Sequence, residues 1–203
     1  MSRSLLPIAV FTLVALGGCA SYDGRLTSTK TKYLGQEGSI VSRSSSSTLA
    51  EKNSYWDGDG AIGAPSIVIS IANQTASFYK GTKLVGISAI SSGREGHDTP
   101  IGNYKILEKD PHHASNLYGD YVDASGTPVV KNIALGVDPM PPGTKFSGSP
   151  MPNFMRLSAA GVGMHQGFLP GVPDSHGCIR MPERMAKIFY ENVAVGTPVQ
   201  IVN

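Results

Sequence analysis

The chain has 203 residues, a formal net charge of +2 and 16% charged residues, with Gly 24, Pro 14 and 7% aromatic residues. This length suits one domain with additional segments, and the composition predicts short strands joined by many turns rather than a helical bundle. The small net charge and the lack of a basic run argue against a nucleic-acid partner.

The first eighteen residues are predicted to be a signal peptide. Arg3 gives a positive start, and Leu5 to Leu16 is an apolar run that would rise only about 18 Å as a helix, well short of the roughly 30 Å hydrocarbon core. The following Leu16-Gly17-Gly18-Cys19 resembles a bacterial lipobox. We therefore expect a lipoprotein signal peptide over residues 1–18 and lipidation of Cys19. An ordinary signal peptide cut near Ala20 is the alternative.

Lipidation would export the chain and anchor it to a bacterial membrane, on the periplasmic face. Because Asp does not follow Cys19 at the second position, outer-membrane sorting is expected in a Gram-negative cell. Residues 19–64 are expected to be a flexible tether, with an end-to-end distance of roughly 35–40 Å as a coil. Tyr33, Tyr55 and Trp56 are candidates to dock onto the following domain.

From Pro65 the pattern changes to that of β-strands rich in β-branched residues. The expected strands are Ser66–Ile71, Thr75–Lys80, Leu84–Ile90 and Asn103–Glu108. We expect them to form an antiparallel meander with one buried face.

The middle of the domain is expected to hold long loops. Residues 110–126 are polar and predicted to be irregular, and 128–137 is another apolar run. Residues 138–152 contain five prolines, so we expect no regular secondary structure there. Such loops are usually functional, and the sequence leaves open whether 138–152 closes over a site.

The last part of the chain should return to regular structure. Phe154–Leu157 and Gly161–His165 are expected to be short strands. A helix is expected to begin at Pro182, with Met185, Ile188 and Phe189 on its buried face. Val199–Val202 is the predicted closing strand.

Cys178 is the candidate nucleophile. If Cys19 carries lipid, Cys178 has no disulfide partner in an oxidising compartment, and such a thiol is either reactive or a small buried apolar residue. A thiol of ordinary pKa needs a base to become an effective nucleophile. His165 and His176 are the candidates, and His165 is preferred because a strand would fix it. Gly177 would let the backbone approach a substrate carbonyl and supply an oxyanion donor.

The same residues also allow structural interpretations. Gly167 and Gly177 could be turn residues, and Arg180 could form a structural ion pair. Zinc bound by His165, His176 and Cys178 lacks a CxxC or HExxH spacing, so we expect neither metal nor cofactor.

Two motifs together resemble the L,D-transpeptidase (YkuD-like) family. These are Ser175–Met181, read with the upstream His165, and the segment Thr99-Pro100-Ile101-Gly102-Asn103-Tyr104. The resemblance extends from about Ser66 to Val202. It implies a catalytic domain over 65–203 that is mainly β, an L,D-transpeptidase-like antiparallel β-sandwich with one C-terminal-side helix and long active-site loops.

The resemblance also implies a reaction. Cys178 would attack the carbonyl of the third stem-peptide residue of peptidoglycan, expel the terminal D-residue and pass the thioester to an acceptor amine. His165 would be the base, oriented by the Gln166 carbonyl, and the N–H groups of Gly177 and Cys178 would face the oxyanion. Carbapenem β-lactams would be covalent inhibitors.

The remaining site residues would bind or support the substrate. His176 and Ser175 match supporting positions, and Arg180 matches an arginine that would hold either a substrate carboxylate or the loop. Gln166-Gly167 stands where many members have Gly-Thr, which leaves the acceptor pocket open. Two other functions stay open: an L,D-carboxypeptidase or hydrolase using the same thioester, and a non-catalytic wall-binding lipoprotein.

Overall fold

The computed structural model describes residue 50 and residues 52–203. They belong to one compact unit, Ser42–Asn203. The expected signal peptide, Cys19 and Tyr33 lie outside the described residues. Within the described part, no helix has both the length and the apolar character needed to cross a membrane.

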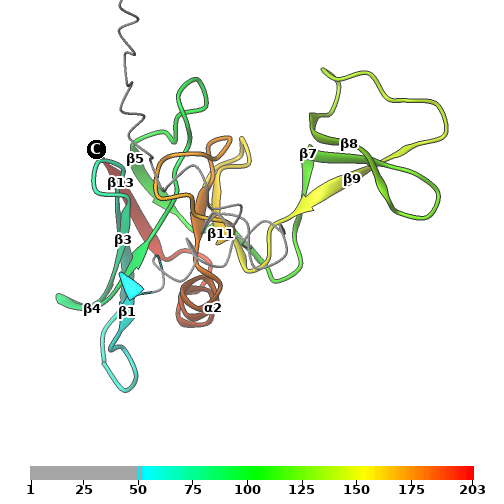
Figure 1. The fold of residues 1–203 in the computed structure, drawn as a ribbon. Coiled ribbons are helices and arrows are strands. Elements are labelled where there is room, and N and C mark those ends of the chain that lie inside the picture. Colours follow the sequence, from blue (N-terminus) through cyan, green and yellow to red (C-terminus); the bar gives the residue numbers. More distant parts are fainter. Residues whose placement is uncertain (1–49, 51) are drawn as a thin grey trace, which may run out of the picture. The chain divides into compact units, whose positions relative to one another are not determined.

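A six-stranded sheet has the order β1-β4-β3-β2-β13-β5 (Figure 1). Its strands are β1 (Tyr55–Trp56), β2 (Pro65–Ser70), β3 (Thr75–Lys80), β4 (Lys83–Ala89), β5 (Gly102–Lys105) and β13 (Pro198–Val202). The alternation expected for the first hairpin is confirmed, because Ile67 and Ile69 on β2 and Ala76 and Phe78 on β3 are buried.

The expected simple meander is wrong beyond β4. β5 pairs with β13 rather than with β4, and β13 runs parallel to β2. β4 instead receives β1, with Tyr55 opposite Ile87 and Trp56 opposite Gly86. Since β3 and β1 flank β4, the chain after β4 leaves this sheet, and residues 90–101 become available to build the site.

Trp56 explains why residues upstream of Pro65 join the domain. Its ring packs edge-on against Phe78, with ring centroids 5.1 Å apart. A Cβ on Gly86 would lie 2.7 Å from the Trp56 ring, so only glycine leaves room for it. Tyr55 and Trp56 therefore dock as the sequence had suggested.

A second sheet has four strands in the order β12-β11-β10-β6. They are β6 (Glu108–Asp110), β10 (Phe154–Arg156), β11 (Gly163–Gln166) and β12 (Ile179–Met181). The predicted strands at Phe154 and His165 are confirmed with slightly shifted ends. β12 was not predicted; it pairs parallel with β11, and its three residues are too short to give a periodic signal.

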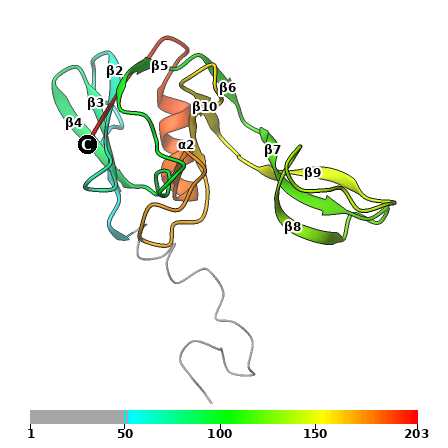
Figure 2. The ribbon, with the colours of Figure 1, turned by 90° about the horizontal axis from the view of Figure 1, so that it is seen from above.

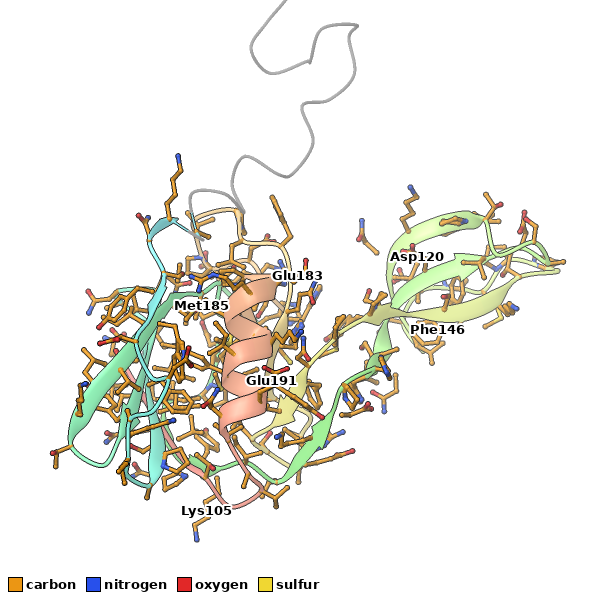
Figure 3. The ribbon with its side chains drawn as sticks, turned by 90° about the horizontal axis from the view of Figure 1, so that it is seen from below. Lys105, Asp120, Phe146, Glu183, Met185 and Glu191 are labelled. Carbon is orange, nitrogen blue, oxygen red and sulfur yellow. The ribbon has the colours of Figure 1, made fainter. Side chains whose placement is uncertain are left out.

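A third sheet has the order β8-β7-β9, from β7 (Ala114–Val122), β8 (Pro128–Ala134) and β9 (Lys145–Pro150). It corrects the prediction of irregular structure over 110–126 and 138–152. Three of the five prolines precede β9, one ends it and one follows it, so none removes a central ladder hydrogen bond. Figure 2 shows this sheet to one side of the six-stranded sheet, and Figure 3 shows Asp120 and Phe146 on it.

The first two sheets share one hydrophobic core with the helix α2 (Glu183–Asn192). Met185, Ala186 and Phe189 are the buried residues of α2, and Ile188 packs at the edge of the core. Figure 3 shows Met185 on the side of α2 that faces the six-stranded sheet. Pro182 lies immediately before the helix rather than at its first position. The predicted mainly β fold with a C-terminal-side helix is confirmed.

Candidate active site

The parallel pair β11–β12 brings Cys178 and His165 to the same place. His165 pairs with Arg180 and Met164 with Ile179, so the register continued by one residue sets Cys178 opposite Gly163. Paired residues of neighbouring strands project to the same side, and alternate residues along a strand do too. Cys178, His165 and Arg180 therefore share one face, and all three line a cavity of about 760 Å³.

His165 is held as a neutral imidazole. Its side chain is buried, and Nδ1 lies 2.7 Å from the carbonyl oxygen of Gln166. A carbonyl only accepts, so Nδ1 carries the proton and the lone pair is on Nε2. The expectation that Gln166 orients this ring is confirmed. Burial lowers the pKa of His165 to about 4; the Gln166 carbonyl opposes the shift, and Arg180 and His113 add to it.

Cys178 rests as a thiol. Burial raises its pKa above the ordinary value, and the N–H of Gly163 together with Arg180 and Arg156 only partly offset this. Its Sγ lies 3.6 Å from the carbonyl oxygen of Gly161 and donates to it. Within the described residues the thiol forms no hydrogen bond with His165. The resting site is thus a neutral thiol and a neutral imidazole, not an ion pair, and the thiol must exchange the Gly161 carbonyl for Nε2 before a proton can pass.

Ser175 shapes the turn that leads into Cys178. Its Oγ accepts the N–H of Gly177 at 3.0 Å and donates to the carbonyl of Cys178. Gly177 has φ +113, a conformation that L side chains rarely adopt. The Gly177 N–H is therefore already paired, which differs from the free oxyanion donor expected from the sequence.

Thr99 fixes the same turn from the other side. Thr99 Oγ1 accepts the N–H of Gly93 at 2.9 Å and donates to the carbonyl oxygen of Gly177 at 2.8 Å. Ser92 adds a further anchor, because its carbonyl accepts the N–H groups of Asp174 and Ser175. The segment between β4 and β5 is thus the scaffold of the cysteine loop, residues 172–178.

Arg180 is bound to the cysteine loop. Its Nη1 lies 2.7 Å from Oδ2 of Asp174, so the guanidinium braces the loop rather than standing free for a substrate carboxylate. Its aliphatic stem packs over Gly167, where a Cβ would lie 3.0 Å from Arg180 Cγ. Gln166 and Gly167 both line the cavity, and the N–H of Gln166 donates to the Pro152 carbonyl.

His176 does not contact the thiol in this structure. Its Nε2 lies 2.9 Å from Nη2 of Arg94, and its ring stacks on Tyr118 with centroids 4.0 Å apart. It lines the cavity, and its contacts link the cysteine loop to Arg94 and Tyr118.

Several cavity residues were not predicted from the sequence. Arg156 forms an ion pair with Glu108 at 2.6 Å, and His113 stacks on Phe154. The other walls come largely from the three-stranded sheet and the turn before β11, including Asn116, Leu117, Tyr118, Asn132, Ser149, Ala159 and Gly161. Most of them lie in the segments 110–126 and 138–152, which were expected to be irregular. Only an alternating pattern within 114–122 could have indicated those on β7, and Gly119 and the polar residues weaken that pattern.

No group of three His, Cys, Asp or Glu side chains in the part of the chain described is arranged to hold a metal ion. The chemistry available on this face is that of a thiol, an imidazole with a lone pair and two guanidinium groups. That set suits acyl transfer through a thioester.

Comparison with known proteins identifies the family of this domain. Residues 64–201 match the family model of the L,D-transpeptidase catalytic domain (YkuD). The chain therefore belongs to the L,D-transpeptidase catalytic domain family.

Particular relatives agree with this assignment. The chain is 31% identical over 144 residues to Escherichia coli K12 "Probable L,D-transpeptidase YbiS", covering 68% of this chain and 44% of the relative. It thus spans less than half the length of that curated relative.

Two solved structures illustrate the shared fold. A crystal structure of an Enterococcus faecium L,D-transpeptidase mutant has a TM-score of 0.50 at 26% identity, covering 70% of this chain and 50% of that one. The structure of LD transpeptidase LdtMt1 in complex with imipenem has a TM-score of 0.52 at 20% identity, covering 68% and 59%.

Proposed function

We propose that the protein is an acyltransferase that forms L,D (3-3 type) peptidoglycan cross-links, or attaches another acceptor amine, through a thioester on Cys178. The observation that carries the proposal is the parallel pairing of β11 with β12, which gives Cys178 and His165 one face and one cavity. Family membership supports the same reaction class.

The first half-reaction forms the thioester. His165 Nε2 takes the thiol proton as Sγ attacks the carbonyl carbon of the third stem residue. The Cys178 N–H is the proposed oxyanion donor, and Gly177 contributes its backbone conformation. His165 then gives the proton to the nitrogen of the departing D-residue. The C–N bond breaks and the acyl group remains on sulfur.

In the second half-reaction the sulfur of Cys178 is the leaving group and an acceptor amine is the nucleophile. The amine attacks the thioester carbonyl, and His165 takes a proton from that amine. The C–S bond then breaks, and His165 gives the proton to the departing sulfur to regenerate the thiol. If water replaces the amine, the product is a trimmed stem and the enzyme is an L,D-carboxypeptidase. His176, Ser175 and Arg180 are proposed to keep the cysteine loop in shape during both steps.

Tetrapeptide-rich wall fragments test the proposal directly. Wild type should release the terminal D-residue and give cross-linked dimers, and Cys178→Ala should give neither. Product masses distinguish transfer from hydrolysis. Trimmed stems without dimers would show that the protein is a carboxypeptidase rather than a transpeptidase. Wall binding by both proteins with no product from wild type would instead support a non-catalytic wall-binding lipoprotein.

A carbapenem provides a second test. Opening of the β-lactam by Cys178 would add the full mass of the drug to the protein. Imipenem is bound in one of the structures that this fold resembles. Wild type should gain one equivalent and Cys178→Ala none. A wild-type protein that stays unmodified would count against the thioester mechanism.

We also propose the targeting expected from the sequence, a signal peptide over 1–18, a lipid on Cys19 and a tether after it, with the protein at the periplasmic face of a membrane. The tether expected over 19–64 is shortened at its end, because Tyr55 and Trp56 form β1 of the six-stranded sheet. Metabolic labelling with a fatty acid tests it. Wild type should incorporate label and fractionate with membranes, whereas Cys19→Ser should do neither. Equal labelling of the two would refute the lipid anchor.

A further inference from the structure

One imidazole joins the cysteine loop to the three-stranded sheet. His176, two residues before Cys178, lies face to face with Tyr118 on β7, with ring centroids 4.0 Å apart and planes at 21°. On another side, His97 from the segment between β4 and β5 meets it edge-on at 4.9 Å and 75°. Aromatic contacts of this kind are worth about 0.5–1.5 kcal/mol each and depend on ring orientation.

Arg94 determines how this imidazole is protonated. Arg94 Nη2 lies 2.9 Å from Nε2 of His176. A guanidinium can only donate, so Nε2 must carry the lone pair and Nδ1 the proton. The backbone N–H of Arg94 also donates to the backbone carbonyl of Ser175 at 3.0 Å. Arg94 thus binds two consecutive residues of the cysteine loop.

The charges around His176 favour the same neutral state. The pKa of His176 is lowered to about 4, first by partial desolvation and then by Arg94, His97 and Arg180, and only Asp174 opposes the shift. Tyr118 presents its ring face rather than a charge. At neutral pH the imidazole is therefore free to accept the Arg94 hydrogen bond.

We propose that Arg94 is a positioning residue that fixes His176 as the Nδ1–H tautomer stacked on Tyr118. This contact holds β7, and with it one wall of the cavity, in a fixed position relative to Cys178. Arg94 does not touch the reacting atoms in this role. The proposal rests on the proposed function for its effect on catalysis, but the tautomer and the stacking can be measured without any reaction.

Nitrogen-15 NMR of the histidine rings tests the structural half. In wild type both His176 and His165 should show the Nδ1–H tautomer, for the different reasons given above. In Arg94→Met, His176 should change to a mixture of tautomers and titrate at higher pH, while His165 stays unchanged as an internal reference. Lys83→Met, an exposed cation on β4, is the matched control. An unaltered His176 in Arg94→Met would overturn the proposal.

Acylation kinetics with a carbapenem test the catalytic half. Arg94→Met and Tyr118→Leu should slow acylation by about tenfold to a hundredfold, the scale of a small misplacement near reacting groups. The loss should fall on the acylation rate constant more than on drug affinity. Tyr118→Phe should restore most of the rate because it keeps the stacked ring.

A failure of the proposed function and a failure of the positioning role of Arg94 give different results. If wild type forms no adduct, the proposed function fails, and the NMR experiment still decides the role of Arg94. If wild type is acylated and Arg94→Met is equally fast, or if Tyr118→Phe is as slow as Tyr118→Leu, the positioning role is wrong.

Discussion

Thr99 and Gly177 are joined by a hydrogen bond of 2.8 Å from the threonine hydroxyl to the glycine carbonyl, across 78 residues of sequence. Gly177 immediately precedes Cys178. The thiol is therefore positioned by a residue from the segment that leaves the six-stranded sheet after β4.

Replacing Thr99 tests this connection. Thr99→Val keeps the shape but leaves the Gly93 N–H and the Gly177 carbonyl without their buried partner, at a cost of about 1–3 kcal/mol. Carbapenem acylation should slow while far-UV circular dichroism is retained. Thr99→Ser keeps the hydroxyl and should stay near wild type in stability. A Thr99→Val protein with wild-type stability and acylation rate would contradict the role of these hydrogen bonds.

The pH dependence of the acylation rate should follow the protonation of His165. Because burial lowers its pKa to about 4, the imidazole stays neutral and basic throughout the neutral range. Acylation should be nearly constant from neutral pH down to mildly acidic pH and should fall as pH approaches 4. Stopped-flow carbapenem acylation measures this profile. A midpoint near the ordinary histidine value of 6.5 would contradict the buried environment.

The same shift predicts a stability change. His165 takes up a proton below about pH 6.5 in the unfolded chain but only near pH 4 in the folded chain. Its contribution to the free energy of unfolding is therefore complete above pH 6.5 and is lost as the pH falls to about 4. The full change is on the order of 3 kcal/mol. Urea titrations at several pH values measure it, and His165→Gln should flatten the slope in this window. An unchanged slope would exclude His165 as its source.

Alkylation by iodoacetamide should report a thiol with a raised pKa. The rate should rise with pH and have its midpoint above the ordinary cysteine value. Arg180→Gln should move the midpoint higher still, since the guanidinium favours the thiolate, and Lys83→Met should not move it. Rapid alkylation that is constant from pH 6 to 8 would show a preformed thiolate instead.

Much of the fold could be predicted from sequence because its inner strands are β-branched and alternate. The hairpin β2–β3 and helix α2 follow from periodicity alone. β5 and β13 show the limit: their partners are set by which edge of the six-stranded sheet remains open after β1 occupies β4, and no local pattern encodes this. β12, in the four-stranded sheet, is too short to give a periodic signal.

The site could be predicted where chemistry and spacing are both unusual, as at Cys178 and His165. Ser175, Gly177 and Thr99 could be named from the motifs, but not the bonds between them. Arg94 and Tyr118 could not be found, because their importance arises only when β7 and the cysteine loop meet at His176. An arginine in a turn and a tyrosine in a polar segment carry no signal of their own.

Trp56 is an intrinsic fluorescence probe of the segment that leads into the domain. It is the only tryptophan in the chain, and it lies on β1 with its Nε1 bound to Asp59 and its ring against Phe78. Its emission therefore senses whether the segment leading into the domain is seated on β4. Intrinsic fluorescence can follow release of that segment separately from events at the sulfur, so detachment and inactivation can be timed in a single sample.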